Sequence, residues 1–298
     1  MANSKQVQKL PISIADDTLA QMPPFWKRFI RNPQAVIGFI IVTTMILIAV
    51  SADIITTYDP VLRAIPDRFT EPNNTHPFGT DQLGRDVLTR MIYGARVSLL
   101  VGLAAVGLSA LIGTTLGAIA GYFAGWADIV ISRLIDTFLA IPGLVLTIGI
   151  VAALGSGLDK LVIAISVSSW PLYARLVRGS FITIKEQEYI QAAIAIGTRT
   201  PRIMLRHILP NAVGPILVVM TISTAGAILT EAGLSYLGIG LEPSIPTWGR
   251  MLADAQEHIR RYSYMSVFPG VGIMIFTLGF NLFGEGLRDL LDPKQKKS

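Results

Sequence analysis

The residue types that most often perform chemistry in proteins are sparse and scattered in this chain. The three histidines, His76, His207 and His258, lack the spacing of metal ligands, and the sequence contains no cysteine. It also contains no Gly-x-x-x-x-Gly-Lys-Ser/Thr phosphate loop and no nucleophile clustered with an acid–base pair. We therefore expect no catalytic residue, no metal site and no cofactor in this chain, and any energy source must lie in another protein.

A second set of polar residues is informative because it interrupts long apolar stretches. Arg133 and Asp136 are three residues apart, which places them on one helix face and favours an internal ion pair facing protein. Glu231 has two open interpretations, a structural hydrogen-bonding role or contact with a cationic group of a substrate. Together with Pro142, which is expected to kink its helix, and Trp248, these residues are our candidates for a gate or translocation path.

The elements that must position these residues are long apolar segments. Of the 298 residues, 51% are hydrophobic and only 15% are charged, against roughly 25% charged residues in typical soluble domains. Windows of about 20 apolar residues are long enough to cross a bilayer as helices. We therefore predict an all-α polytopic membrane protein with six transmembrane helices, at about 34–55, 96–121, 129–153, 158–179, 211–233 and 265–284.

The distribution of basic residues orients these six helices. Fifteen lysines and arginines fall in the two terminal tails and around the loop between the fourth and fifth helices, whereas nine fall in the other loops. Because basic residues are enriched on the inner side of membranes, we expect both termini and this loop in the cytosol. The expected parts are a cytosolic N-terminal tail (1–33), the first transmembrane helix (34–55), an extracytoplasmic loop (56–95), a transmembrane core domain (96–286) and a cytosolic C-terminal tail (287–298).

Four glycines recur at every fourth position near the end of the second span: Gly113, Gly117, Gly121 and Gly125. A repeated Gly-x-x-x-Gly face lets the backbone of a neighbouring helix approach closely. This pattern predicts helix packing within the subunit, and a place in a subunit interface or a moving gate is the alternative.

The stretch 188–210 between the fourth and fifth spans predicts two short helices. The first is expected to end with Gly197 in the left-handed conformation that costs glycine least. Thr200 is expected to cap the second helix, with Pro201 in its first position and Pro210 closing it. A surface helix lying on lipid headgroups would share these features.

The same stretch resembles the cytosolic coupling motif of bacterial ABC-importer permeases, which reads Glu-Ala-Ala, three residues, Gly, nine residues, Ile, one residue, Leu-Pro. Two positions depart from it, because Gln191 replaces Glu and His207 replaces Ile. Segments 79–96, 133–142, 231–238, 246–249 and 281–293 narrow the resemblance to the C-type permease of di- or oligopeptide importers and of related nickel importers. The matching positions of the motif are Gln191, Ala192, Ala193, Gly197, His207, Leu209 and Pro210.

The resemblance implies a type I ABC importer permease fold in a bacterial cytoplasmic (inner) membrane, with coupling helices at about 186–209. It implies a second permease subunit, two cytosolic ATP-binding subunits that bind ATP and Mg, and an extracytoplasmic solute-binding protein. The chain itself would be non-catalytic, would contact membrane lipid and would bind no nucleic acid. In the coupling motif, Ala192, Ala193 and Gly197 would allow close contact with an ATPase, and Ile190, Ile194 and Ile196 would bury apolar surface.

Two other functions stay open from the sequence. A nickel or metal-chelate importer would differ mainly in its pore lining and its binding protein. A secondary transporter would need its own coupling-ion sites or an inverted repeat, and the sequence shows no such repeat.

Overall fold

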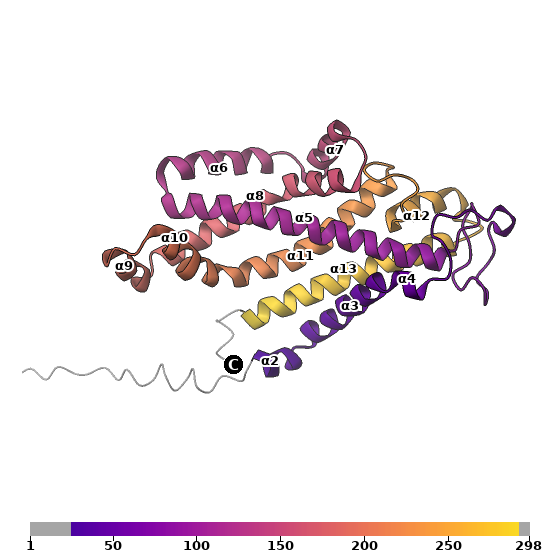
Figure 1. Ribbon diagram of the computed structural model, residues 1–298, viewed down its shortest axis with the longest axis horizontal. Coiled ribbons are helices and arrows are strands. Elements are labelled where there is room, and N and C mark those ends of the chain that lie inside the picture. The colour runs from indigo at the N-terminus through magenta and orange to yellow at the C-terminus, as the bar shows by residue number, and fades with distance from the viewer. Residues whose placement is uncertain (1–24, 292–298) are drawn as a thin grey trace, which may run out of the picture.

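The computed structural model describes residues 25–291, and this part of the chain is almost entirely helical (Figure 1). Within these residues the only pairing of extended backbone is an isolated bridge between Thr80 and Asp86. Both ends of the described chain lie toward the end of the bundle that carries α9 (Glu188–Ala195) and α10 (Thr200–Arg202) (Figure 1). Most of the expected N-terminal tail, residues 1–24, and the last residues of the C-terminal tail, 292–298, lie outside the described residues.

All six expected apolar stretches form helices, which confirms the all-α polytopic fold class. Five helices are long and apolar enough to cross a membrane, and a bent pair of helices makes a sixth crossing where the pair is counted as one broken span. This pair is bent by 90° at a short break that ends at Pro142, where the sequence predicts a kink. The candidate spans are α3 (Pro33–Val50), α5 (Val87–Phe123), α8 (Leu158–Lys185), α11 (Leu209–Tyr236) and α13 (Tyr264–Leu291), and the bent pair is α6 (Gly125–Leu139) with α7 (Gly143–Leu154).

Helix α5 begins nine residues before the expected start of the second span. Its N-cap is Asp86, whose carboxylate accepts a hydrogen bond from the amide of Thr89 at 2.8 Å. The helix has 37 residues and is therefore about 55 Å long, whereas the hydrocarbon core of a bilayer is about 30 Å thick. Its first turns must consequently stand outside the hydrocarbon, where polar and charged side chains are tolerated.

The remaining short helices lie at the two ends of the bundle (Figure 1). One end carries α4 and α12, and the chain enters the bundle through α2 at the other. Their bounds are α2 (Phe25–Arg31), α4 (Ala52–Ile55) and α12 (Trp248–Ala255), with single 3₁₀ turns at Ile65–Asp67 and Gln256–His258.

Glycines on α5 allow it to pack tightly against α8. A Cβ atom at Gly113 would lie 2.5 Å from the carbonyl oxygen of Trp170, and one at Gly121 would lie 2.7 Å from that of Arg178. Gly117 lies equally close to the backbone of α8 at Ala174. This is the close approach that small residues permit between membrane helices.

The fourth glycine of the pattern, Gly125, does not take part in this packing. It follows Ala124 and is the first residue of α6, has a positive φ of 55°, and has open space where a Cβ would lie. The expectation that it packs with the other three is wrong, because α5 ends at Phe123 and the chain turns before this residue.

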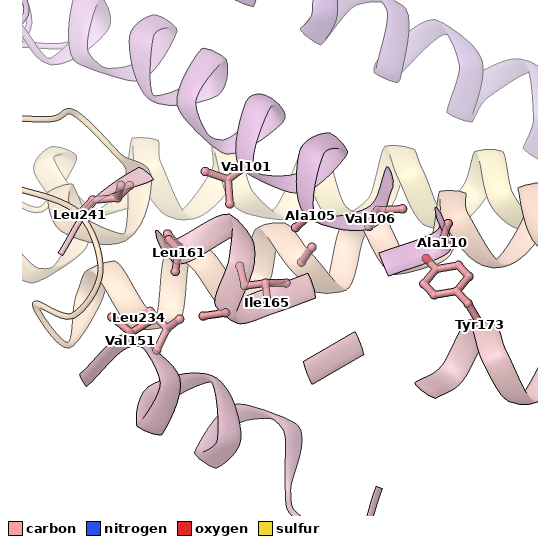
Figure 2. Close-up of a cluster of buried hydrophobic side chains, with 12 residues drawn as sticks. Val101, Ala105, Val106, Ala110, Val151, Leu161, Ile165, Tyr173, Leu234 and Leu241 are labelled. Carbon is pink, nitrogen blue, oxygen red and sulfur yellow. The ribbon is translucent and has the colours of Figure 1, made fainter. Parts of the chain in front are cut away.

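A buried apolar cluster fills the space where α5, α7, α8 and α11 meet (Figure 2). Helix α5 contributes Val101 and Ala105, which face Leu161 and Ile165 of α8. Leu234 extends the cluster to α11, and small side chains alternate with branched ones, as in close-packed interiors.

The loop before α5 is anchored to the bundle by buried charges. Arg85 contacts Asp81 at 2.6 Å and Asp254 of α12 at 3.3 Å. Arg90 is 1% exposed, lies 3.6 Å from Asp81, and donates a hydrogen bond to the carbonyl oxygen of Pro60 at 3.1 Å. These contacts link residues 56–86 to α5 and α12. Because a buried charge is costly unless it is paired, separating the loop from the two helices would be unfavourable.

Replacing Asp81 by alanine is expected to destabilise this loop by about 3–5 kcal/mol, since it leaves the buried Arg90 without its carboxylate partner. Thermal unfolding of the purified protein should show a midpoint several degrees lower. The control is Glu71→Ala, at an exposed position of the same loop, which should unfold like the unmodified protein. Equal unfolding midpoints for the two variants would show that the charge network does not stabilise the loop.

Candidate functional site

The end of α9 is built as the sequence predicts. The amide of Gly197 donates to the carbonyl oxygen of Ile194 at 2.9 Å, and the amide of Thr198 donates to that of Ala193 at 3.1 Å. This pair of bonds is the Schellman arrangement, and Gly197 has the positive φ of 78° that it requires. The glycine thus ends α9 sharply and redirects the chain toward α10.

Buried isoleucines attach α9 and α10 to the bundle. Ile190, Ile203 and Ile208 are at most 1% exposed and pack in one cluster with Val177 and Phe181 of α8. Burying each of these side chains contributes about 1.5–3 kcal/mol. The segment 188–208 is therefore held firmly on the ends of α8 and α11, so that a displacement of α9 must also displace them.

Other apolar side chains of this segment point away from the bundle. Ile196 is 82% exposed and Leu205 is 64% exposed, and Ile194 and Tyr189 are also exposed. We call these four residues the α9–α10 apolar surface. The resemblance implies that Ile190, Ile194 and Ile196 bury apolar surface against an ATPase. Ile194 and Ile196 are exposed and could do so, whereas Ile190 faces the bundle of this chain. An exposed apolar surface of this kind is typical of a protein interaction site.

The second helix differs from the expectation at both of its ends. Arg199, not Thr200, occupies the N-cap position, and Pro201 lies in the first turn as predicted. Pro210 does not end the helix. A π-helical segment, Ile203–Ile208, carries the chain from α10 into α11, so that Thr200–Tyr236 is one continuous helix. A π-helical turn is wider than an α-helical one and shifts the backbone hydrogen bonds by one residue. This shift occurs just before Pro210, which has no amide hydrogen to donate, so the helix can pass through the proline.

Of the two departures from the coupling motif, Gln191 has a side-chain partner, whereas His207 is contacted through its backbone carbonyl. The side-chain amide of Gln191 donates a hydrogen bond to the carbonyl oxygen of Lys185 at 2.8 Å, which a glutamate could not do when ionised. Lys185 in turn donates to the carbonyl oxygen of Tyr122 at 2.7 Å. His207 is half-buried, and its carbonyl oxygen accepts from the side chain of Asn211 at 2.6 Å. The remaining motif residues, Ala192, Ala193, Leu209 and Pro210, lie at the surface or are half-buried.

The charged residues of α6 do not form the ion pair expected from their spacing. Asp136 pairs with Arg175 of α8 at 2.8 Å, and Arg133 is exposed without an ion-pair partner within residues 25–291. Neighbouring α8 places a guanidinium closer to Asp136 than the residue one turn away on α6. The sequence alone did not reveal this partner, because Arg175 lies 39 residues from Asp136 and was counted, with Arg178, only among the basic residues that orient the helices.

Glu231 is completely buried in α11 and acts as a hydrogen-bond acceptor. Its carboxylate accepts from the hydroxyl groups of Ser98 and Ser235, each at 2.8 Å. The carbonyl of the next residue, Ala232, lies so close to Gly249 of α12 that a Cβ at Gly249 would overlap it. Trp248 is 2% exposed and donates from its indole nitrogen to the carbonyl oxygen of Met91 at 2.9 Å.

The five candidates for a gate or path therefore fall into separate groups. Glu231 and Trp248 lie together where α5, α11 and α12 meet, and both are buried. Arg133 and Asp136 are exposed on α6, and Pro142 begins α7. Within the described residues, no group of three or more histidines and carboxylates lies close enough to hold a metal ion.

Comparison with known proteins identifies the family. A profile described as "Binding-protein-dependent transport system inner membrane component" matches residues 113–297, and one described as "N-terminal TM domain of oligopeptide transport permease C" matches residues 23–77. The chain belongs to the binding-protein-dependent transport permeases. It is thus the inner-membrane, multi-pass permease component of an ABC importer.

Individual relatives match the permease over nearly its whole length. It is 45% identical over 271 residues to the dipeptide transport system permease protein DppC of Alkalihalophilus pseudofirmus, covering 91% of this chain and 89% of the relative. It is 42% identical over 273 residues to the glutathione transport system permease protein GsiD of Pectobacterium atrosepticum, covering 91% of each chain. The GsiD protein of Escherichia coli is 41% identical over 288 residues, covering 96% of this chain and 95% of the relative.

A solved structure supports the fold. An inward-facing structure of the MetNI methionine ABC transporter superposes with a TM-score of 0.55 at 18% identity, covering 68% of the permease and 96% of that chain. The type I importer permease fold predicted from the coupling motif is therefore confirmed.

In the permease, replacing Glu231 by alanine is expected to destabilise the fold by about 1–3 kcal/mol, because two buried hydroxyl groups lose their acceptor. Glu231→Gln keeps the shape and one acceptor oxygen, so it should lose clearly less. Thermal unfolding of the two purified variants measures the difference. If both variants unfold at the same temperature, the hydrogen bonds to the carboxylate do not stabilise this junction.

Proposed function

We propose that this permease moves di- or oligopeptides into the cell as one subunit of an ATP-driven importer. The observation that carries the proposal is the 45% identity over 91% of the chain to a dipeptide permease. The glutathione permeases, 41–42% identical, are also named for a peptide-like cargo, and none of the three relatives described above is named for nickel. Membership of the family also favours an ATP-driven importer over a secondary transporter.

The proposed partners are a second permease subunit, two cytosolic ATP-binding subunits and an extracytoplasmic solute-binding protein. ATP and Mg would be bound by the ATP-binding subunits, and this chain would perform no catalysis of its own. The exposed α9–α10 apolar surface supports docking of an ATP-binding subunit, since apolar groups exposed to water gain by being covered. The absence of a phosphate-loop sequence agrees with an external source of work.

We place both termini and the segment 188–210 in the cytosol. The excess of lysine and arginine in the tails and around this segment supports that orientation. The fold is consistent with it, because both ends of the described chain and α9 lie toward the same end of the bundle (Figure 1). The loop 56–86 and α12 would then face the binding protein's side of the membrane.

Closure of the ATP-binding subunits would move α9 and α10, and the buried isoleucines would transmit this movement. Ile190 packs on the end of α8, and Ile203 and Ile208 belong to the helix that continues into α11. Both helices would therefore tilt as stiff rods. Shifts of this kind between packed helices are how many transporters and switches operate.

Uptake of a radiolabelled dipeptide tests the proposed cargo. Cells that lack the gene should lose most ATP-dependent uptake of the peptide and regain it when the gene is restored. Excess unlabelled di- and tripeptides, including glutathione, should compete, and Ni²⁺ should not. Loss of nickel uptake with unchanged peptide uptake would assign the permease to the nickel importers instead.

A further inference from the structure

Helix α2 has an apolar face and a basic face, although it is only seven residues long. At about 100° per residue, its four apolar side chains fall on one side of the helix and its three basic side chains fall on the other. The apolar residues are Phe25, Trp26, Phe29 and Ile30, and the basic residues are Lys27, Arg28 and Arg31. This division is typical of a helix that lies in the plane of a membrane surface.

The connection to α3 places α2 at the level of the lipid headgroups. A single residue, Asn32, separates the two helices. Helix α3 is a candidate span of 18 residues and is about 27 Å long, whereas the hydrocarbon core is about 30 Å thick, so α3 needs its whole length to cross. Its first residue, Pro33, must therefore lie at the edge of the hydrocarbon, and α2 lies next to that edge.

The apolar face of α2 is only partly covered by the bundle. The ring of Phe29 lies 5.6 Å from that of Phe39 on α3, which attaches α2 to the span. Trp26 and Ile30 are 70% and 72% exposed. At the depth that α3 sets, these two side chains are positioned to meet the upper part of the acyl chains, where tryptophan is enriched in membrane proteins.

A polar pocket of about 510 Å³ lies between α2, the start of α3 and the end of α13. We call it the α2 pocket, and the polar residues that line it are Arg28, Arg31, Asn32, Gln34 and Asp289. Figure 1 shows α2 beside the ends of these two helices.

The α2 pocket carries a net positive charge. Arg28 and Arg31 form no ion pair within residues 25–291, and Asp289 is the one carboxylate in the lining. Asp289 accepts a hydrogen bond from the side chain of Asn32 at 3.3 Å, and Asn32 also caps α3 by accepting from the amide of Ala35 at 3.0 Å. The cap places the positive end of the α3 dipole at the same pocket.

This chemistry suits a phosphate group that carries a net negative charge. Guanidinium groups bind phosphate oxygens through paired hydrogen bonds and are always charged. In a zwitterionic lipid an attached ammonium group cancels the phosphate charge, whereas an anionic lipid keeps it. Basic pockets and basic segments beside spanning helices recognise anionic lipids for this reason.

We propose that the α2 pocket binds the phosphate of an anionic phospholipid through Arg28 and Arg31, with the apolar face of α2 against the acyl chains. A lipid bound there contacts α3 and α13 together, because the hydrogen bond between Asn32 and Asp289 joins the two helices at the pocket.

Fluorescence quenching by brominated lipids tests the proposal on the full-length permease. Every vesicle contains equal parts of anionic phosphatidylglycerol and zwitterionic phosphatidylcholine, and only one of the two lipids carries bromine near the headgroup end of its acyl chains. The emission of Trp26 is the difference between the unmodified protein and Trp26→Phe. We expect this emission to be quenched about twofold or more strongly when phosphatidylglycerol carries the bromine.

The double variant Arg28→Gln with Arg31→Gln should bring the ratio of the two quenching values to about one, because the charge that selects the anionic lipid is removed. The matched control is Arg63→Gln with Arg68→Gln, which removes two positive charges from the exposed loop at the other end of the bundle. This control should keep the ratio of the unmodified protein.

Three results would overturn the proposal. A ratio of one in the unmodified protein would mean that the pocket does not select anionic lipid, and an unchanged ratio in the double variant would mean that Arg28 and Arg31 do not bind it. No quenching by either lipid would mean that protein covers α2. Inorganic phosphate, added in place of sodium chloride at equal ionic strength, should leave the ratio unchanged; loss of the ratio would assign the pocket to free phosphate instead. None of these measurements uses a cargo, so peptide import and lipid binding stand or fall separately.

Discussion

Replacing Ile196 by glutamate is expected to reduce ATP-driven uptake at least tenfold while the permease remains inserted in the membrane. Ile196 is 82% exposed and lies next to the glycine that ends α9, so it makes little contribution to the fold of the isolated chain. In contact with an ATP-binding subunit, a buried isoleucine would contribute about 1.5–3 kcal/mol, and a buried unpaired carboxylate would cost still more. A loss of about 1.4 kcal/mol already weakens binding tenfold.

The measurement is peptide uptake together with the ATP hydrolysis that the binding protein stimulates. Both should fall together, and the amount of permease in the membrane should not change. Ile65→Glu is the matched control, because this isoleucine is also exposed but lies in the loop at the other end of the bundle. Uptake and hydrolysis at unmodified levels in Ile196→Glu would show that the α9–α10 apolar surface is not the docking site.

Gly117→Leu is expected to remove folded permease from the membrane at 37 °C. The backbone of Ala174 and the Cβ of Val177 occupy the space that the new side chain would need. A helix backbone cannot rotate away as a side chain can, so α5 and α8 must separate along the contact that organises the bundle. We expect a loss of about 3 kcal/mol or more, at the upper end of the cost of overpacking.

Gly107→Leu provides a control on the same helix. The site of its Cβ has no neighbouring atom within 4 Å, so the identical substitution meets open space. Size-exclusion chromatography of detergent extracts measures the folded fraction of each variant, and thermal unfolding measures its stability. Equal stability of the two variants would contradict the tight packing of α5 on α8.

Patterns that depend on local backbone chemistry were predictable from the sequence. The apolar lengths identified the five long spanning helices and the bent pair of α6 and α7. The position of Gly197 identified the end of α9, because only a left-handed residue completes that turn. The four-residue spacing of glycines identified the face of α5 that packs on α8. The coupling motif at 188–210 predicted the place where an ATP-binding subunit would dock. The sequence of this chain alone contains no information on that subunit itself.

Features that depend on neighbours distant in the sequence were not predictable. Asp136 lies one turn from Arg133 on α6. Its ion-pair partner is nevertheless Arg175 of α8, which is 39 residues further along the chain. Pro210 was expected to end a helix. In the structure the π-helical segment Ile203–Ile208 precedes it, and the helix continues through Pro210 into α11. The exposed position of Ile194 and Ile196 likewise depends on which face of α9 the bundle covers.

The continuity of Thr200–Tyr236 makes this helix a lever arm. With 37 residues it is about 55 Å long, so a tilt of about 5° around its middle displaces its two ends by roughly 2 Å in opposite directions. One end carries the α9–α10 apolar surface, and the other carries Glu231 and the backbone of Ala232 that touches α12. If a partner tilted this helix as one piece, a push of atomic size at one end would become an opposite displacement of similar size at the other. The π-helical segment and Pro215 are the two places where it could bend instead.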